Sequence, residues 1–229
     1  MKLDVLDHGY VRLVNSMGTE TDIANAARVS YDKEVWDLSD NDKKLIRFLV
    51  RHRHDSTMRH NVMTFEVYAP LMVARQWWKH HVSSTHVEDQ NGWNESSRRY
   101  ITEEPVFYNP CYKKWRSKPE NNKQGRGGPV QKDTGVIANN LLARHIDKSI
   151  QLYEEAMARG VAPEQARLFL PAYAMYVRWR WTASLNAILS FLDLRQGATA
   201  QDEITEYANA VAIFVEGQYP VAMEAWRER

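Results

Sequence analysis

The sequence predicts a mixed α/β (α+β) fold that forms a single domain over residues 1–229. Segments with the alternating apolar pattern of a β-strand and longer segments with the 3.6-residue periodicity of a helix follow one another along the chain. Their intermixing predicts the class. A chain of 229 residues with 44% apolar and 26% charged residues also has the size and composition of a globular protein with one substantial core.

The first half of the chain is predicted to alternate strands and helices. Residues 10–14 alternate weakly between apolar and polar side chains and residues 62–69 alternate clearly, so both are predicted strands. Residues 21–29 and 39–52 have helical periodicity. A further helix is predicted to begin at Pro70, because a proline lacks only an N–H that the first turn of a helix leaves unused.

The second half is predicted to begin with a basic loop and to continue mainly as helices. Residues 113–132 hold seven Lys or Arg against one acidic residue, with several glycines, which is typical of a mobile surface loop. Residues 136–159 follow as a long amphipathic helix that Gly160 ends. The alternation at residues 175–181 favours a strand over a helix. The remaining predicted helices are 163–170, 184–195 and 202–217.

Bulk properties exclude several classes of protein. A net charge of +1 gives no overall field that would attract nucleic acid or an anionic membrane. No apolar run approaches the roughly 18 residues of a membrane span, and the N-terminus lacks the apolar core of a signal peptide. Cys111 is the only cysteine, so an internal disulfide is excluded, which fits a reducing compartment. We therefore expect a cytoplasmic protein.

The stretch from residue 75 to residue 100 is rich in basic, aromatic and hydrogen-bonding side chains. Gln76, Lys79 and His80 are three and four residues apart, so on a helix they share one face. That face offers an amide and two basic groups to a ligand. An ordinary solvated helix face is the alternative interpretation.

The end of the same stretch suits a phosphate group. Ser96, Ser97, Arg98 and Arg99 combine hydroxyl donors with the bidentate forks of guanidinium groups. The alternative is a surface turn with incidental charge.

Two arginines further along the chain stand among apolar neighbours in the sequence. Arg167 and Arg195 would each need an anion in such surroundings, supplied either by the protein or by a ligand. A structural salt bridge is the alternative for both.

Other kinds of site are not predicted. The histidines show no H-E-x-x-H pattern and no paired cysteines accompany them, so we predict no metal site. Cys111 has no adjacent base that would activate it, so a structural thiol is the favoured interpretation.

Six short motifs spread over most of the chain carry a family resemblance. They are His54-Asp55-Ser56 with His60, Ala74-Arg75-Gln76-Trp77-Trp78, Asn94-Glu95-Ser96-Ser97-x-Arg99-Tyr100, Asn122-Lys123-Gln124-Gly125, Ala166-Arg167 with Leu170-Pro171, and Phe191-Leu192-Asp193-Leu194-Arg195. In their joint order and spacing they resemble the flavin-dependent thymidylate synthases, the family unrelated to the cysteine-using enzyme.

The resemblance implies a fold, an assembly and a reaction. The implied subunit has a small antiparallel or mixed sheet with long helices, and it assembles as a homotetramer with active sites between subunits. The implied reaction is the reductive methylation of deoxyuridylate (dUMP) to thymidylate (dTMP). NADPH would reduce bound FAD, and 5,10-methylenetetrahydrofolate would supply the carbon. The family uses no enzyme nucleophile on the pyrimidine, which agrees with an unactivated Cys111.

The resemblance also implies roles for individual residues. Arg195 aligns with the arginine that activates the pyrimidine in this family. The residues implied to hold dUMP are Gln76, Glu95, Ser96, Ser97, Arg99, Arg167 and Arg195. The residues implied to contact FAD or its surroundings are His54, Ser56, Lys79, His80, His81 and Ser190.

The sequence departs from the family pattern mainly on the flavin side. Lys79-His80-His81 stands in place of Arg-His-Arg, and an insertion over residues 84–92 follows it. Ser190 replaces an expected asparagine, Thr199 an expected histidine and Arg59 an expected acid. The residues for dUMP are nearly intact, so we expect a diverged member, such as one encoded by a virus or phage.

Two alternatives remain open from the sequence. The altered flavin side suggests a related enzyme that makes another C5-modified deoxyuridylate, such as hydroxymethyl-dUMP. The basic loop 113–132 and the abundant aromatic residues are also compatible with a non-enzymatic nucleic-acid-binding module.

Overall fold

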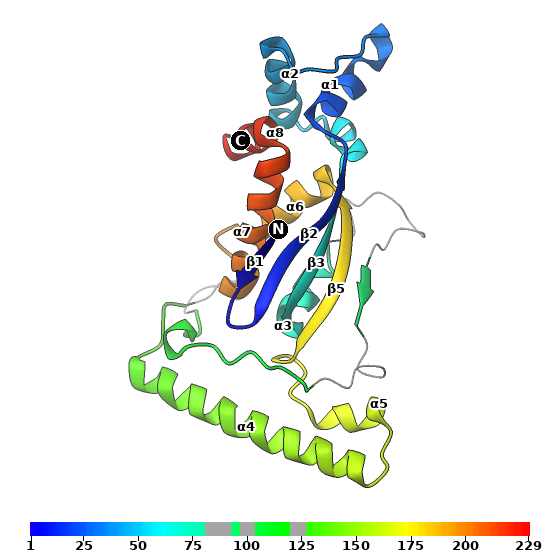
Figure 1. The fold of residues 1–229 in the computed structure, drawn as a ribbon. Helices are drawn as coiled ribbons and strands as arrows, with labels where there is room; N and C mark the ends of the chain where they lie inside the picture. The colour runs from blue at the N-terminus through cyan, green and yellow to red at the C-terminus, as the bar shows by residue number, and fades with distance from the viewer. Residues whose placement is uncertain (81–92, 97–103, 120–126) are drawn as a thin grey trace.

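The computed structural model describes residues 1–80, 93–96, 104–119 and 127–229. At the centre of these residues lies an antiparallel five-stranded sheet with the strand order β1-β2-β3-β5-β4 (Figure 1). The strands are β1 (Lys2–Val5), β2 (Gly9–Met17), β3 (Val62–Pro70), β4 (Trp93–Glu95) and β5 (Tyr176–Ser184).

The central pair of strands, β3 and β5, determines which face of the sheet is buried. Phe65 lies opposite Trp181, and Val67 lies opposite Trp179. All four side chains are buried, whereas the intervening Arg180 is exposed. Because side chains alternate between the two faces of a strand, the apolar alternation in the sequence gives the sheet one core face and one polar face.

Eight α-helices of the described chain surround the sheet. They are α1 (Glu20–Arg28), α2 (Asp40–Arg51), α3 (Leu71–Trp77), α4 (Lys132–Ala158), α5 (Pro163–Ala166), α6 (Leu185–Arg195), α7 (Asp202–Gln218) and α8 (Pro220–Arg227). The 3₁₀ helices of the described chain are η1 (Val29–Tyr31), η2 (Asp55–His60), η3 (Tyr112–Lys114) and η4 (Arg167–Phe169).

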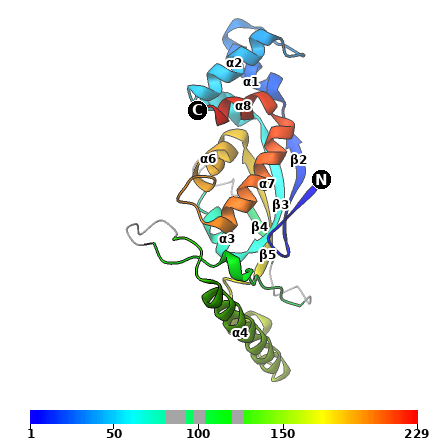
Figure 2. The same ribbon diagram turned by 90° about the vertical axis from the view of Figure 1, so that its left-hand side faces the viewer.

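The helices occupy three places around the sheet. Helices α6 and α7 cover its core face (Figure 2). Helices α1, α2 and α8 pack together at one end, and α4 with α5 extends away from the other end as an arm (Figure 1). We use the name arm for α4, α5 and η4.

Local sequence signals explain where the key helices begin. Ser39 Oγ accepts a hydrogen bond from the backbone N–H of Asp42, and the Asp42 carboxylate accepts one from the backbone N–H of Ser39, which forms a capping box before α2. At the start of α6, Ser184 Oγ accepts from the backbone N–H of Ala187. Helix α6 is buried over most of its length, so its position against the sheet is set by packing.

An aromatic cluster joins α3, β5 and α6. Trp77 stacks on Phe191 with ring centroids 4.4 Å apart, and it meets Trp179 and Trp181 edge to face. Trp77 and Trp179 are each 1% exposed. These aromatic residues therefore fill the core, and they hold the end of α3 against α6.

The basic loop predicted at residues 113–132 is anchored at both of its described ends. Lys114 pairs with Glu206, and Arg116 Nε donates to Asp202 at 2.6 Å. The backbone of Ser117 bonds to Gly128 at 2.9 Å, and α4 begins within the predicted loop, at Lys132. Charge pairing and backbone bonds thus anchor the described ends of this loop, and its mobility stays a prediction. Residues 120–126 lie outside the described part of the chain.

Most of the predicted elements are confirmed. The three predicted strands and the helices at 21–29, 39–52, 136–159, 184–195 and 202–217 are present with shifted bounds, and the predicted helix 163–170 is divided into α5 and the 3₁₀ turn η4. Strands β1 and β4 and helix α8 were not predicted. The helix from Pro70 ends at Trp77, so Lys79 and His80 follow it in a turn instead of extending its face. No helix in the described residues is both long and apolar enough to cross a membrane.

Candidate functional site

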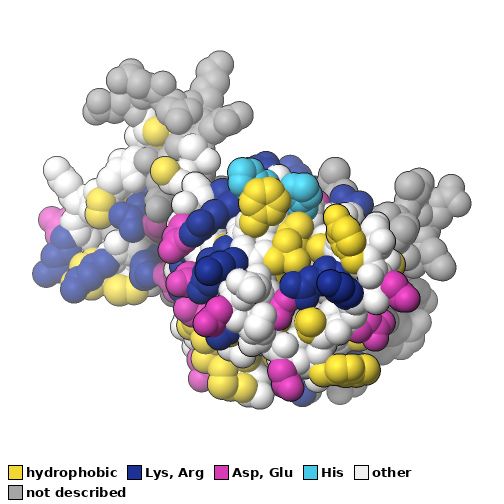
Figure 3. Space-filling view, turned by 90° about the horizontal axis from the view of Figure 1, so that it is seen from above, with side chains coloured by type: hydrophobic (Ala, Val, Ile, Leu, Met, Phe, Trp, Pro, Cys, Tyr) yellow, Lys and Arg dark blue, Asp and Glu magenta, His cyan; other side chains and the backbone are white. Residues whose placement is uncertain are grey.

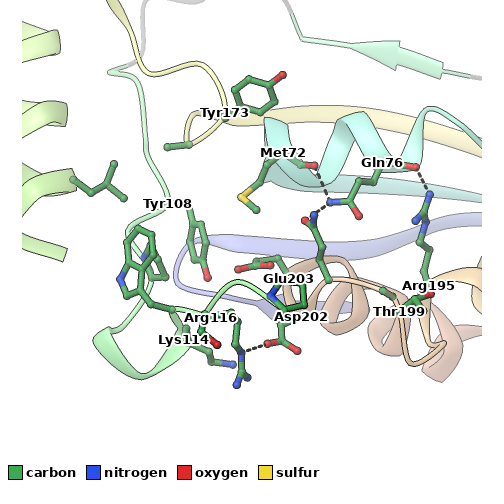
Figure 4. A pocket seen from close by; sticks show the side chains of 18 of the residues that line it. Met72, Gln76, Tyr108, Lys114, Arg116, Tyr173, Arg195, Thr199, Asp202 and Glu203 are labelled. Atoms are coloured by element: carbon green, nitrogen blue, oxygen red, sulfur yellow. Dashed lines mark hydrogen bonds and ion pairs between the residues drawn. The ribbon is translucent and has the colours of Figure 1, made fainter. Parts of the chain in front are cut away.

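A cavity of about 890 Å³ lies between α3, the junction of α6 with α7, and residues 104–119 (Figure 4). We call residues 104–119 the strap. The polar and charged side chains that line the cavity are Gln76, Lys79, Lys114, Arg116, Ser117, Arg195, Thr199, Gln201, Asp202 and Glu203. Aromatic lining comes from Tyr108, Trp115 and Tyr173. The cavity thus combines basic donors, amides and apolar planar surface.

Helix α3 positions Gln76 on the wall of the cavity. Its side-chain nitrogen Nε2 donates to the backbone oxygen of Met72 at 3.2 Å and to Oε1 of Gln201 at 2.7 Å. The following Trp77 is held in the aromatic core. The chain then turns, so that Lys79 reaches the cavity from outside the helix.

Arg195 is the last residue of α6 and is partly buried. Its Nε–H donates to Nε2 of His80 at 2.7 Å, and its NH2 group donates to the backbone oxygen of Gln76 at 3.0 Å. Burial lowers the pKa of the Arg195 guanidinium. Both acceptors are neutral, and only two of the five guanidinium N–H donors are used in these bonds. The guanidinium therefore keeps donors for a further group in the cavity.

The side chains of Thr205 and Gln196 make hydrogen bonds across the junction between α6 and α7. Thr205 Oγ1 lies 2.9 Å from the backbone oxygen of Arg195 and 2.8 Å from that of Gln201. A second bond across the junction runs from Gln196 Nε2 to Asn209 Oδ1 at 2.7 Å. The Thr205 contacts hold the end of α6 close to the start of α7.

The strap brings charge to the opposite wall, but that charge is paired. Arg116 bonds to Asp202 and Lys114 to Glu206, both on the first turns of α7. Burial raises the pKa of the Glu203 carboxyl beside them. Burial also raises the pKa of the Tyr108 hydroxyl, so this phenol stays protonated at neutral pH.

The structure brings together five of the residues that the sequence singled out. Gln76, Lys79, Arg195 and Thr199 line the cavity, and His80 bonds to Arg195. Ser190 lies on the same helix as Arg195 and is partly buried.

Two predicted residues lie at the other end of the molecule. His54 and Ser56 are exposed, His54 as the N-cap of η2 and Ser56 within η2, which packs against α6. The ring of Phe48, half exposed, lies 4.3 Å from that of His52 and 5.6 Å from that of His54. Figure 3 looks down on this end and shows histidine and apolar side chains gathered on one surface.

Of the four residues predicted to hold a phosphate at positions 96–99, the structure describes Ser96, which does not line this cavity. Ser96 follows β4, where its backbone N–H donates to the oxygen of Arg178 at 2.8 Å. Glu95 ends β4, and Ser97, Arg99 and His81 lie outside the described residues.

Arg167 corrects one expectation. It lies on the arm with its side chain exposed, and its Nε donates to the backbone oxygen of Glu164 at 3.1 Å. The prediction of apolar surroundings was wrong because Leu168 and Phe169, its neighbours in sequence, are themselves exposed.

Sequence reasoning missed the contribution of the strap and of the start of α7. Gln201 stands immediately before the predicted helix 202–217, in the segment that follows the helix of Arg195. That position was a usable signal, because two helices joined by a short connection bring their ends together. The strap carried no comparable signal.

Comparisons with known proteins agree with this architecture. The profile of the family described as "Thymidylate synthase complementing protein" (Thy1) matches residues 12–221. A flavin-dependent thymidylate synthase of Thermotoga neapolitana is 36% identical over 231 residues, which covers 99% of this chain and 94% of that protein. The enzyme of the same name from Thermus thermophilus is 36% identical over 228 residues, covering 100% of this chain and 79% of that protein.

A solved structure shows the same fold. The UMP/dUMP methylase PolB from Streptomyces cacaoi, bound with 5-Br dUMP, superposes with a TM-score of 0.82 at 28% identity, covering 99% of this chain and 97% of that one. These matches define the chain as an enzyme of the methyltransferase class. It belongs to the flavin-dependent thymidylate synthase family.

Proposed function

We propose that the protein methylates C5 of dUMP to give dTMP, with FAD as cofactor and with NADPH and 5,10-methylenetetrahydrofolate as co-substrates. The names of its relatives and the dUMP analogue held by PolB support this reaction. The observation that carries the proposal is Arg195, whose partly buried guanidinium bonds only neutral acceptors in the described chain and lines the cavity beside Gln76.

Arg195 would act as an electrostatic catalyst. Removing water from a cation strengthens its interaction with any anion that enters the cavity. Donors directed at a carbonyl oxygen of the pyrimidine stabilise the negative charge that develops there as C5 becomes nucleophilic. Because His80 and Gln76 already fix the guanidinium, little reorganisation is needed when the charge develops.

Nucleotide binding is proposed to need more than one subunit. Gln76 and Arg195 share the cavity, whereas Arg167 lies on the arm and Ser96 beside β4. If Glu95, Ser96, Ser97, Arg99 and Arg167 hold dUMP as the resemblance implies, a second copy of the chain has to supply part of this set.

The arm supports the proposed homotetramer. It extends away from the sheet (Figure 1) and exposes apolar side chains of α4 and η4. Ile137 is 59% exposed, Leu141 54% and Leu168 83%. Apolar groups gathered on a projecting element are typical of a surface that another subunit covers.

The residues proposed for FAD fit an anionic, planar group in their chemistry. The Lys79 ammonium suits a diphosphate, and the His80 ring, edge-on to Phe191 at 5.0 Å, offers an aromatic contact. His81 would add a ring and Ser190 a hydroxyl from α6, whereas His54 and Ser56, at the other end of the described chain, would reach the same FAD only from a second copy. FAD, when bound, supplies the redox and one-carbon transfer chemistry that these side chains cannot.

The test is a product assay with purified protein and added FAD. We expect a flavin absorption band, and with dUMP, NADPH and methylenetetrahydrofolate a product with the mass of dTMP. A product with one further oxygen would instead identify the hydroxymethyl-forming enzyme, which the altered Lys79-His80-His81 motif and the insertion at 84–92 favour as second candidate. Failure to bind any flavin contradicts both.

The nucleic-acid-binding alternative is not proposed. Lys114 and Arg116, two cations of the basic loop, pair with Glu206 and Asp202. Trp115 donates its indole N–H to Asn139 and lines the cavity. These two cations are therefore already paired within the chain, and this ring is not presented on an open surface where bases could stack.

A further inference from the structure

The side-chain amide of Gln76 has its orientation fixed by two hydrogen bonds. Its Nε2 lies 3.2 Å from the backbone oxygen of Met72 and 2.7 Å from Oε1 of Gln201. A backbone carbonyl only accepts hydrogen bonds, so the atom of Gln76 that faces Met72 must be the nitrogen. The assignment of nitrogen and oxygen in this amide thus follows from its partner.

Gln201 completes that arrangement. The second N–H of Gln76 points to Gln201, and the atom that receives it must be the amide oxygen. Gln201 occupies the N-cap position of α7 but makes no side-chain capping bond, so its oxygen is available to Gln76. Thr205 holds its backbone oxygen at 2.8 Å, which fixes the position of the residue.

These bonds leave the oxygen of Gln76 as the group that a ligand meets. Both N–H groups are used, and within the described chain no hydrogen bond to Gln76 Oε1 is found. Gln76 lines the cavity together with Arg195, which donates to the Gln76 backbone oxygen (Figure 4). The cavity wall therefore offers the donors of a guanidinium next to a fixed acceptor.

We propose that Gln201 is a positioning residue that holds the Gln76 amide with its oxygen toward the cavity, so that the site accepts a hydrogen bond from the nucleotide. This inference rests on the proposed function, in which Gln76 binds dUMP. Two groups of that ligand have the required donor chemistry, the N3–H of the pyrimidine and the 3′-hydroxyl of the sugar. A ligand with only acceptors at this point faces the amide oxygen and binds less tightly.

A double-mutant cycle on dUMP affinity tests the proposal, by titration calorimetry of the full chain with FAD present. Gln201→Leu removes the acceptor for Gln76 Nε2 at an exposed position, and we expect about 10-fold weaker dUMP binding. In a Gln76→Ala background the same change should alter affinity less than about twofold, because Gln201 acts through Gln76. Gln201→Glu keeps an acceptor oxygen and should largely restore the coupling to Gln76.

A matched control lies on the same junction. Gln196→Leu removes an equivalent amide bond, to Asn209 at 2.7 Å, outside the residues that line the cavity, and dUMP affinity should be unchanged. Wild-type affinity in Gln201→Leu, or the same loss in both Gln76 backgrounds, overturns the positioning role.

Two analogues identify the donor on the ligand. N3-methyl-deoxyuridylate lacks the N–H, and 2′,3′-dideoxyuridylate lacks the 3′-hydroxyl. The analogue without the contacted donor should bind wild type and Gln76→Ala about equally. If both analogues bind Gln76→Ala more weakly than they bind the wild type, Gln76 is not acting as an acceptor for either donor. A wild-type protein that binds no dUMP overturns the proposed function and this inference with it, whereas the outcomes above leave the proposed function standing.

Discussion

The Nε–H of Arg195 donates a hydrogen bond of 2.7 Å to Nε2 of His80. A ring nitrogen of histidine accepts only when it carries no proton, so this contact requires His80 to be unprotonated at Nε2. The edge-to-face contact with Phe191 fixes the plane of the ring. His80 thus orients the group proposed to polarise the pyrimidine.

Replacing His80 tests that orientation. His80→Leu removes the acceptor, so Arg195 samples other directions and turnover of dUMP should fall about 10- to 100-fold. His80→Gln retains an acceptor oxygen at a similar reach and should keep more of the activity. Steady-state kinetics at saturating FAD would measure the difference. The flavin absorption band serves as control, and a leucine variant with normal flavin and normal turnover contradicts the role.

Asp42 should make the stability of the molecule depend on pH in the acid range. Hydrogen bonds from Ser39, and then the Arg28 guanidinium, hold the pKa of the Asp42 carboxyl below its usual value. Because the folded pKa is lower than the unfolded pKa, the unfolded state binds more protons in acid. The stabilisation is therefore complete above the unfolded pKa and is lost as the pH falls through the folded pKa.

The corresponding variant is Asp42→Ala. It removes the capping box and the ion pair of a residue that is 2% exposed, and should lower the free energy of unfolding by about 2 kcal/mol at neutral pH. Urea unfolding between neutral pH and about pH 3 should also show a flatter pH dependence than the wild type. Asp40→Ala, at a neighbouring exposed carboxylate, is the control. Parallel pH profiles for wild type and Asp42→Ala would contradict the assignment.

Trp77 offers a test of packing in the aromatic cluster. Trp77→Ala leaves a large cavity between β5 and α6 and should cost about 3–5 kcal/mol of stability. Its indole N–H is buried with no acceptor among the described residues, so Trp77→Phe also removes an unpaired donor. We expect the phenylalanine variant to lose only about 1–2 kcal/mol in chemical denaturation. Equal losses in the two variants would show that the ring volume is not what stabilises this site.

The arm provides a test of assembly. Leu141→Glu puts a charge on the exposed apolar face of α4 shared with Ile137, and should shift a tetramer toward smaller species. Light scattering coupled to size-exclusion chromatography would measure the mass. Asn140→Glu adds the same charge on the adjacent side of the helix and should have a smaller effect. A tetramer that survives Leu141→Glu, or a monomeric wild type, contradicts the proposed interface.

The periodicity of apolar residues located the strands and helices in which the buried side chains recur at a regular spacing. Strand β3 and helix α7 are long, and each buries one regular set of positions, so the sequence alone located both. Strand β4 has three residues, too few to show an alternation. The end of α3 was misplaced because Gln76, Lys79 and His80 continue a helical spacing, whereas the burial of Trp77 and the contact of His80 with Arg195 end the helix first.

A site residue was predictable where its neighbours in the sequence are also its neighbours in the folded structure. Arg195 was identified from its apolar neighbours, and the structure confirms a partly buried guanidinium. The same reasoning failed for Arg167, since its apolar neighbours are exposed on the arm. Gln201 was missed because its relation to Gln76 joins positions 125 residues apart, and no local pattern encodes such a contact.

The hydroxyl of Thr205, which contacts the backbone oxygens of both Arg195 and Gln201, has a mechanical consequence. The last residue of α6 and the N-cap of α7 both contact this one small side chain. The strap is fastened by Lys114 and Arg116 to the first turns of the same α7. A displacement of the strap that moves the start of α7 is therefore transmitted to Gln201 and Arg195 together. The group that positions the Gln76 acceptor and the guanidinium donor then move as one unit.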